Sequence, residues 1–162
     1  MAYRRIIAAL DRSSQDETVF AQSLELAKLS DGELLLFHCI SVIEEDEEGR
    51  DDLYEANVID FTVRLEAIRR EWEEKHREQT QQWMQSYLDR AKTDGVRATS
   101  QCVVGEIDRT LPDIIEHWSA DLVVIGRRHH RGLKALLWGD IRMHWLDRIP
   151  CAILVANSPD KR

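Results

Sequence analysis

Residues 4–14 have the sequence RRIIAALDRSS, and this stretch decides the fold. The apolar run at 6–10 stops abruptly at Asp11, which is typical of a buried strand followed by a loop. Ser13 or Ser14 is then suited to cap a helix, and a glutamate three residues after Ser14 makes a capping box. We therefore expect a strand, a loop and a helix at the start of the chain.

The same alternation of short apolar runs and helical patterns continues along the chain. Further strand-like runs lie at 33–40, 98–104, 121–125 and 151–156, with helical patterns between them, including 107–118. Apolar strands that alternate with helices are typical of parallel βαβ units. We expect residues 1–162 to form one α/β domain, a doubly wound, Rossmann-like, five-stranded parallel sheet with helices on both faces.

The composition is that of a globular protein and narrows the choice of partners. The chain has 162 residues, of which 43% are hydrophobic and 32% are charged, as in one ordinary globular domain. Its formal net charge of −8 argues against binding along a nucleic-acid backbone. No apolar run is long enough to span a membrane, and the N-terminus lacks an export-signal pattern. We expect neither a nucleic acid nor a membrane as a partner.

The three cysteines bear on the cellular compartment. Cys39, Cys102 and Cys151 each lie in an apolar run, and none forms a CxxC motif. This odd number and these positions favour buried, reduced thiols in the core. Because reduced thiols are typical of the cytoplasm, we expect a cytoplasmic protein.

Residues 44–52 form an acidic segment, with seven acids in nine residues. A calcium loop needs Asp or Asn at alternate positions before a suitably placed glycine, and that pattern is absent. We therefore expect a solvated loop.

The segment at about 54–93 has the periodicity of one long helix. Its apolar residues follow steps of three and four along the chain: Phe61, Leu65, Ile68, Trp72, Trp83, Tyr87 and Ala91. Such a helix is longer than a sheet-covering helix needs to be, so its excess, including Trp72, either projects from the domain or packs on a partner. The long helix is therefore our candidate surface for a protein partner.

The segment 126–141 is the candidate for ligand binding. Its basic residues are concentrated in an otherwise acidic chain: Arg127, Arg128, Arg131 and Lys134. Gly126 and Gly139 bracket the segment, and glycines let backbone N–H groups approach an anion closely. This combination suits a phosphate or a nucleotide, whereas the alternative is a solvated basic loop that offsets acidic neighbours.

Several motifs of catalysis are missing. There is no GxGxxG after the first strand, no phosphate-binding GxxxxGK[ST] and no GxSxG around Ser13 or Ser14. His129 and His130 are neighbours whose side chains diverge, so we do not expect a metal site. We assign no catalytic residue and do not expect a conventional enzyme.

Six short segments are spread over nearly the whole chain: IIAALDRS (6–13), LLFHC (35–39), VGE (104–106), ADLVVIG (120–126), GLKALLWG (132–139) and IPCAILV (149–155). In this order and spacing they resemble the universal stress protein family. The resemblance implies a fold like that of adenine-nucleotide hydrolases, the strand order 3-2-1-4-5, and a homodimer that uses the last strand, 151–156. An apolar strand at a sheet edge favours such pairing by itself.

The family divides into members that bind ATP and members that do not. Binders carry Gly, two residues, Gly, nine residues, and then Gly-Ser or Gly-Thr. This chain keeps Gly126 and Gly139, but His129 replaces the middle glycine and Asp140 replaces the hydroxyl residue. A Cβ at His129 blocks close approach of the backbone to a phosphate. The carboxylate of Asp140 repels a phosphate, by roughly 4 kcal/mol for a unit-charge contact at an effective ε of 20.

The resemblance also implies where an adenine nucleotide would lie. Asp11 would approach the sugar or the base, the backbone at Cys39 would face adenine, and Gly126 and Gly139 would line the phosphates. The full set of candidate binding residues is Asp11, Cys39, Gly126, Arg127, His129, Gly139, Asp140 and Ile141. ATP with Mg²⁺ is the candidate cofactor.

Three hypotheses for function follow, in order of preference. The first is a dimeric stress-response protein with a degenerate nucleotide pocket, which does not bind ATP stably and acts through protein partners. The second is a regulatory module that binds ATP or another adenine nucleotide, with at most slow hydrolysis. The third is an adenylating or pyrophosphatase enzyme, which needs a glycine-rich loop that the residues after Asp11 do not provide.

Overall fold

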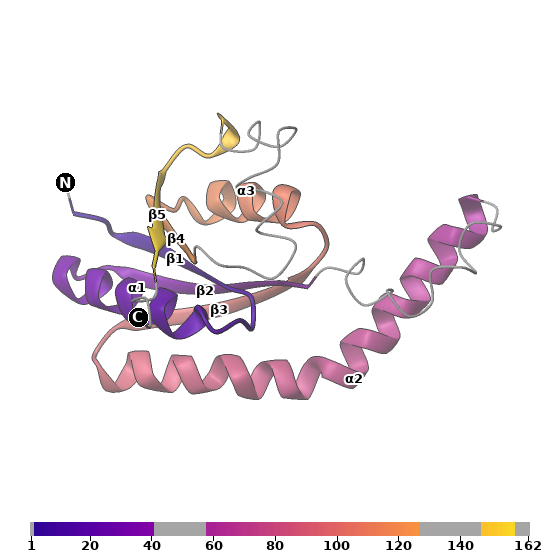
Figure 1. Ribbon diagram of the computed structural model, residues 1–162, viewed down its shortest axis with the longest axis horizontal. Coiled ribbons are helices and arrows are strands. Elements are labelled where there is room, and N and C mark those ends of the chain that lie inside the picture. The colour runs from indigo at the N-terminus through magenta and orange to yellow at the C-terminus, as the bar shows by residue number, and fades with distance from the viewer. Residues whose placement is uncertain (1, 41–57, 127–146, 158–162) are drawn as a thin grey trace.

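The computed structural model describes residues 2–40, 58–126 and 147–157. Within them the chain forms a parallel sheet with the strand order β3-β2-β1-β4-β5 (Figure 1). The elements are β1 (Arg5–Leu10), α1 (Asp16–Ser30), β2 (Glu33–Ile40), α2 (Val58–Thr93), β3 (Arg97–Val104), α3 (Ile107–Trp118), β4 (Leu122–Gly126) and β5 (Ala152–Ala156). The predicted fold class and strand order are confirmed.

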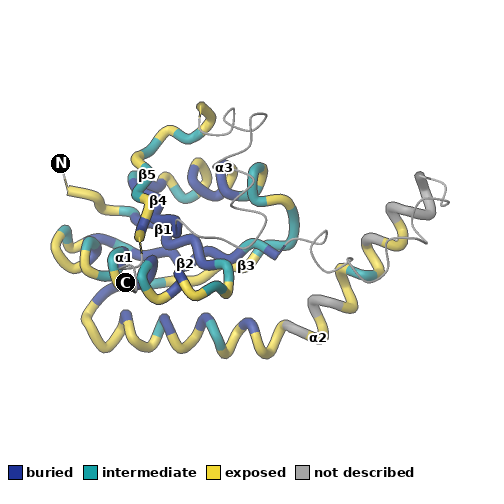
Figure 2. The backbone as a smooth tube through the Cα atoms, in the orientation of Figure 1, coloured by how far each residue is buried: buried dark blue, intermediate teal, exposed yellow. Residues whose placement is uncertain are grey.

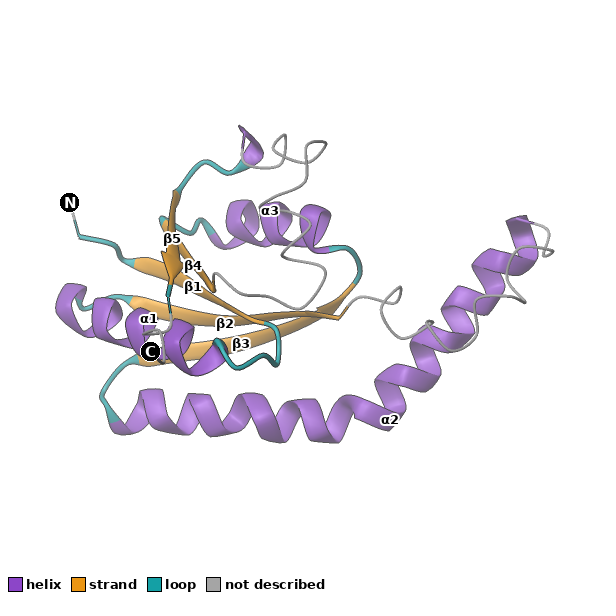
Figure 3. Ribbon diagram, viewed as in Figure 1, coloured by secondary structure: helices purple, strands orange, loops and turns teal. Residues whose placement is uncertain are grey.

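The sheet lies between two helical layers, with α1 and α2 on one face and α3 on the other (Figure 3). Alternate residues of the strands feed the two cores, because successive side chains of a strand point to opposite faces. Ile6 and Leu36 pack with the α1 and α2 residues Val19, Phe20, Ala27, Met84, Tyr87 and Ala91. Ile7 and Phe37 pack with the α3 residues Leu111, Ile114 and Ile115. Both faces of β1 and β2 are therefore buried, which explains their continuous apolar runs (Figure 2).

The first helix begins in a different way from the one predicted. Gln15 occupies the N-cap of α1 and makes no capping hydrogen bond with its side chain. The Ser13 hydroxyl accepts a hydrogen bond from the Gln15 N–H at 3.2 Å, and both carboxylate oxygens of Glu17 accept from the Arg90 guanidinium. The predicted capping box from Ser14 is therefore wrong, because its glutamate is bonded to α2.

The cysteines are free, but the prediction that all three are buried in the core is wrong. Cys39 and Cys151 are half-buried, and Cys102 is exposed. Cys102 lies on β3, which is an outer strand of the sheet and has four exposed residues in a row at 99–102. An edge strand has neighbours on one side only, so an apolar run there does not guarantee burial.

The long helix α2 begins at Val58 within the described residues, and its C-terminal part packs beside β3 and against α1. Figure 1 shows that α2 bends and that its N-terminal part extends away from the sheet. The described side chains of this extension are almost all exposed (Figure 2). Residues 54–57, the acidic segment 44–52 and the side chain of Trp72 lie outside the described residues.

Candidate ligand site at the carboxyl ends of the strands

Strands β1 and β4 separate at their carboxyl ends. Their pairing runs from Ile6 opposite Leu122 to Ala8 opposite Val124, and each strand continues for two more residues. On the other side of β1, the β2 strand extends to Ile40, beyond the last residue that it pairs with β1. The connections of the sheet reverse direction at β1 and β4, and parallel sheets bind ligands at such a point. The carboxyl end of β1, where sheets of this kind form a ligand-binding crevice, is therefore the candidate site.

Three of the predicted binding residues meet at this end of the sheet. Asp11 directly follows β1, Cys39 is the penultimate residue of β2, and Gly126 is the last residue of β4. The other five candidates lie outside the described residues: Arg127, His129, Gly139, Asp140 and Ile141. Of the three described residues, the family resemblance assigns Asp11 and Cys39 to the sugar and the base, and Gly126 to the phosphates.

The loop after β1 is held by hydrogen bonds of Asp11. The Asp11 N–H donates to Oδ1 of Asp16 at 2.9 Å, and Oδ1 of Asp11 accepts from the Ser13 N–H at 3.1 Å. Between Asp11 and Ser13, the backbone of Arg12 has a φ of +60°, a left-handed conformation that residues other than glycine rarely adopt. These hydrogen bonds offset the cost of that conformation and fix the Asp11 carboxyl at the edge of the crevice.

Asp16, in the first turn of α1, is in contact with Asp11. Its side chain is only 4% exposed, and its Oδ1 accepts the Asp11 N–H at 2.9 Å. Burial is the main cause that raises the pKa of Asp16 to about 7; the neighbouring Asp11 carboxyl contributes to the rise, and the backbone N–H donors of Asp11 and Arg12 oppose it. Two neighbouring carboxyl groups repel each other when both are ionised, which favours a proton on the buried one.

Aromatic and basic side chains lie beside this loop. The Arg12 guanidinium lies 5.0 Å from the centre of the Trp83 ring of α2, and the His38 ring meets Trp83 edge-on at 5.0 Å between centres. Nδ1 of His38 is 2.8 Å from the Leu10 carbonyl oxygen, which makes this nitrogen the donor. Burial lowers the pKa of His38, so the imidazole is neutral. Trp83 thus connects the end of β1, the end of β2 and the long helix.

The side chain of Cys39 is engaged on the α3 side of the sheet. Its Sγ donates to the Gly105 carbonyl oxygen at 3.3 Å, and the Thr110 hydroxyl donates to the same Sγ at 3.3 Å. A ligand above β1 would therefore meet the backbone of Cys39 rather than its thiol, as the family resemblance implies.

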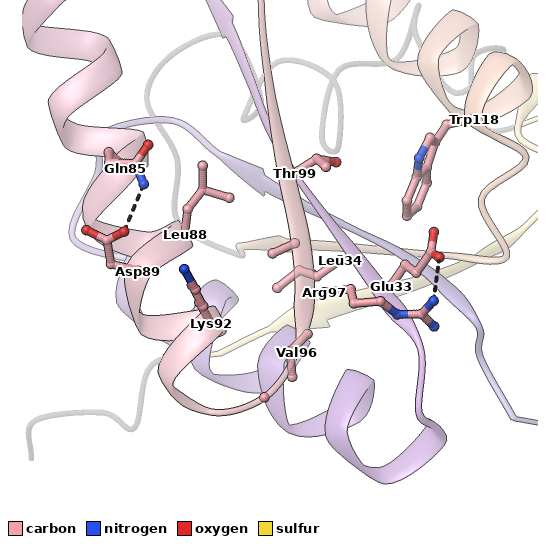
Figure 4. Close-up of a pocket in the computed structure, with 12 residues that line it drawn as sticks. Glu33, Leu34, Gln85, Leu88, Asp89, Lys92, Val96, Arg97, Thr99 and Trp118 are labelled. Atoms are coloured by element: carbon pink, nitrogen blue, oxygen red, sulfur yellow. Dashed lines mark hydrogen bonds and ion pairs between the residues drawn. The ribbon is translucent and has the colours of Figure 1, made fainter.

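A groove of about 700 Å³ lies at the opposite end of the sheet, between α2 and β3 (Figure 4). Four of its polar side chains are paired with one another: Gln85 donates to Asp89 at 2.8 Å, and Arg97 forms an ion pair with Glu33 at 3.3 Å. Because it adjoins the amino ends of β2 and β3, it does not fit the usual ligand position in such a sheet.

Two further searches concern the described part of the chain only. Residues 2–40, 58–126 and 147–157 contain no cluster of three His, Cys, Asp or Glu residues that could hold a metal ion. None of the helices in these ranges is long and apolar enough to cross a membrane.

Sequence reasoning missed Arg12, Asp16 and Trp83 as residues of this site. Trp83 was placed only in the apolar stripe of the long helix, and its contact with Arg12 joins segments far apart in the sequence. Asp16 carried one usable signal, because it is an acid five residues after the strand-terminal Asp11. Two acids that flank a tight loop between a strand and a helix can meet across that loop.

The sheet and its strand order define an α/β protein of the doubly wound class. The sequence pattern of the universal stress protein family matches residues 2–157, and the chain belongs to this family. It is 31% identical to the universal stress protein Sll1388 of Synechocystis sp., over 97% of this chain and 99% of that protein.

Solved structures agree with this assignment of the fold. The protein MJ0577 superimposes with a TM-score of 0.73 at 19% identity, and the alignment covers 99% of this chain and all of that one (100%). A universal stress protein in complex with cAMP superimposes with a TM-score of 0.57 at 18% identity, covering 97% of this chain and 98% of that one. The predicted family is confirmed.

Proposed function

We propose that this chain is a dimeric regulatory protein of the stress response that acts through partners and does not hold ATP stably. The observation that carries the proposal is a carboxyl group in the segment that the family resemblance assigns to the phosphates. Asp140 stands where ATP-binding members of the family have a hydroxyl. A triphosphate brings several negative charges to this place, and each unit-charge contact costs about 4 kcal/mol at an effective ε of 20.

The basic residue next to Asp11 does little to offset this charge. Arg12 stacks its guanidinium on Trp83, and the contact ties the cation to α2 rather than to the crevice. A triphosphate would have to break this contact in order to use Arg12.

Calorimetric titration of nucleotide-stripped protein with MgATP tests the proposal, together with a mass measurement of any co-purified nucleotide. We expect no heat of binding and no co-purified ATP. Saturable binding near one site per chain would overturn the proposal. It would mean that the basic residues after Gly126 compensate for His129 and Asp140.

An adenine nucleotide with a single phosphate is the second candidate ligand. The separation of β1 from β4 and the position of Asp11 support it, because both belong to the sugar and base half of the pocket. One structural neighbour is a universal stress protein in complex with cAMP. A single phosphate also brings less charge near Asp140 than ATP does. The same titration with cAMP tests this candidate, and a bound cAMP without bound ATP would make the chain a nucleotide-dependent regulator.

The dimer in this proposal forms through residues 151–156. Strand β5 is an outer strand of the sheet, and Val155 on it is 42% exposed. An uncovered apolar edge strand favours pairing with a second copy. Protein partners would bind the extension of α2, where charged residues are exposed on a helix that projects from the domain (Figure 1).

We also propose that the protein acts in the cytoplasm. The support is chemical: Cys39, Cys102 and Cys151 form no disulfide, and exposed thiols such as Cys102 persist in a reducing compartment. Fractionation of cells that produce the tagged protein tests this location, and recovery outside the cytoplasmic fraction would contradict it.

A further inference from the structure

The Asp11–Asp16 pair is the feature of the site that its proposed function does not use. Asp16 lies in the first turn of α1, more than nine-tenths buried, and receives the Asp11 N–H at 2.9 Å. We propose that Asp16 is a positioning residue: it keeps the proton that the two carboxyl groups share, so that Asp11 stays ionised, its loop stays closed, and ligand binding at Asp11 depends on that proton.

The geometry decides which of the two carboxyl groups keeps the proton. The Asp11 N–H bond to Oδ1 of Asp16 brings the two residues together, and two neighbouring carboxyl groups cannot both be ionised without strong repulsion. Asp16 is nearly inaccessible to water, whereas Asp11 is half-buried and its Oδ1 accepts the Ser13 N–H at 3.1 Å. The Ser13 N–H stabilises the ionised form of Asp11, while burial raises the pKa of Asp16 to about 7. The proton therefore lies on Asp16.

The charged groups around the pair do not replace that proton. The titratable and charged neighbours in the described residues are Arg12 of the same loop, Glu17 of α1, His38 of β2, and Tyr87 and Arg90 of α2. Both arginines are engaged elsewhere, one on Trp83 and the other with Glu17. Burial keeps His38 and Tyr87 neutral near pH 7. A second negative charge on the pair would meet no described cation that is free to balance it.

The loop supplies the link to the ligand. It holds Arg12 at a φ of +60° through the hydrogen bonds of Asp11, so repulsion between two ionised carboxylates would weaken the closed loop. A ligand that donates hydroxyl or amine hydrogens to Asp11 needs this carboxylate both ionised and fixed. Binding would therefore weaken as pH rises above the titration of Asp16, by at most about tenfold per pH unit for one proton. The pH dependence of ligand binding rests on the proposed ligand, an adenine nucleotide with a single phosphate, whereas the shared proton does not.

The substitution Asp16→Asn imitates the protonated form. Its amide oxygen can accept the Asp11 N–H, and its NH₂ can donate to the Asp11 carboxylate, without a titrating group. Glu17→Gln is the matched control, because it removes the adjacent carboxylate of the same helix turn without touching the pair. Both variants are compared with the wild-type chain.

The first experiment uses the ligand-free protein and follows the carboxyl carbons of the aspartates by NMR between about pH 4 and pH 9. We expect a step near neutral pH that is sensed by both Asp11 and Asp16, is retained in Glu17→Gln, and is absent in Asp16→Asn. The wild-type titration is informative even if the asparagine variant does not fold. Titration of both carboxyl groups in the ordinary acidic range would overturn the proposal.

The second experiment measures the affinity for cAMP on either side of neutral pH. We expect the wild-type affinity to fall by about tenfold from about pH 6 to about pH 8, as one proton with a pKa near 7 requires, and the affinity of Asp16→Asn to stay nearly constant. An equal loss in both proteins would show that the loop does not depend on the proton of Asp16. If no cAMP binds while the neutral titration is observed, the nucleotide proposal fails and the shared proton stands.

Discussion

The Arg12 guanidinium lies 5.0 Å from the centre of the Trp83 ring, so the loop after β1 is joined to α2 at the edge of the crevice. Trp83 also meets the buried His38 ring edge-on, and Tyr87 one helical turn further along α2. The same helix extends beyond the sheet (Figure 1). The loop that carries Asp11 therefore contacts the same helix to which we assign the protein partner.

Replacement of Trp83 tests this connection. Trp83→Leu removes the cation–π contact with Arg12 and the ring contact with His38, and we expect it to lower the free energy of unfolding by about 1–3 kcal/mol. Trp83→Phe keeps an aromatic face and should lose less than half as much. Denaturant unfolding of the two variants measures the difference. Equal losses in both would show that packing volume, not the aromatic face, determines the effect.

The pH dependence of stability provides a second test of the Asp16 assignment. Its pKa of about 7 in the folded protein lies above the ordinary value of 3.8, so the folded state binds more protons than the unfolded state between these values. The contribution of Asp16 to stability is therefore present at acidic pH and is lost as pH rises through about 7, with a slope of at most about 1.4 kcal/mol per pH unit. We therefore expect the free energy of unfolding of Asp16→Asn to rise relative to that of the wild type as pH increases across this range, as measured by denaturant unfolding.

Glu17→Gln should behave in the opposite way. The hydrogen bond from Arg90 lowers the pKa of Glu17, so its contribution is present above the ordinary value of 4.5 and is lost as pH falls through the lowered pKa. The pair is exposed to solvent, which keeps this contribution within about 1 kcal/mol. If Glu17→Gln were more stable than the wild type near pH 7 by as much as Asp16→Asn, the pH dependence could not be assigned to the raised pKa of Asp16.

The strands were predictable because each is a short apolar run that the sheet buries, as at 6–10 and 33–40. The contacts of the site were not, since periodicity predicts that a residue is buried but not which neighbour it meets. The sequence around Ser14 matched a capping box, yet Glu17 bonds with Arg90 from a helix that begins at Val58. A local sequence motif contains no information about a partner that only the tertiary fold brings into contact with it.

Cys102 illustrates the same limit at the sheet edge. Its apolar neighbours Val103 and Val104 predicted burial, but β3 has a strand on one side only and Cys102 is exposed. Edge position depends on strand order, and in the sequence analysis that order came from the family resemblance rather than from the composition of the strand. The described site residues that the resemblance named, Asp11, Cys39 and Gly126, lie at strand ends, whereas Asp16 and Trp83, which it did not name, are contributed by α1 and α2.

Substitutions at the ends of the helices should change the stability of the protein in opposite directions, depending on whether a glycine is introduced or removed. Asp31 and Ser119 end α1 and α3 in left-handed conformations, with φ of +51° and +54°, and Gly95 follows α2 with φ of +75°. Glycine adopts this conformation without steric cost. We expect Asp31→Gly and Ser119→Gly each to stabilise the protein by up to about 1 kcal/mol, and Gly95→Ala to destabilise it by about 1 kcal/mol.

Thermal or denaturant unfolding measures these changes. The Gly95→Ala cost should come from the backbone alone, because a Cβ built there meets no atom within 4 Å. Destabilisation by Asp31→Gly or Ser119→Gly would show that those side chains contribute more than their backbone conformation costs.

The proposed dimer depends on the edge of β5. Val155 is 42% exposed on this strand, and a charge there would be buried without a partner when two copies pair. We expect Val155→Lys to shift the protein from dimer to monomer in sedimentation velocity without loss of helical content. Val155→Thr, which keeps a β-branched side chain, is the control and should remain dimeric. A lysine variant that sediments as the wild type does would place the interface elsewhere.

The last prediction concerns the phosphate half of the pocket, where the chain departs from the ATP-binding members of its family. The double change His129→Gly and Asp140→Ser restores the glycine and the hydroxyl of the binding pattern. It removes a Cβ from the path of a phosphate and replaces a repelling carboxylate with a donor, so we expect affinity for MgATP to rise at least about tenfold. Asp140→Asn is the matched control, because it removes the charge alone and should recover only part of the gain. Calorimetric titration measures all three proteins under one set of conditions. An unchanged affinity in a folded double variant would mean that these positions do not limit binding, and would direct attention to the carboxyl groups of Asp11 and Asp16 at the other side of the crevice.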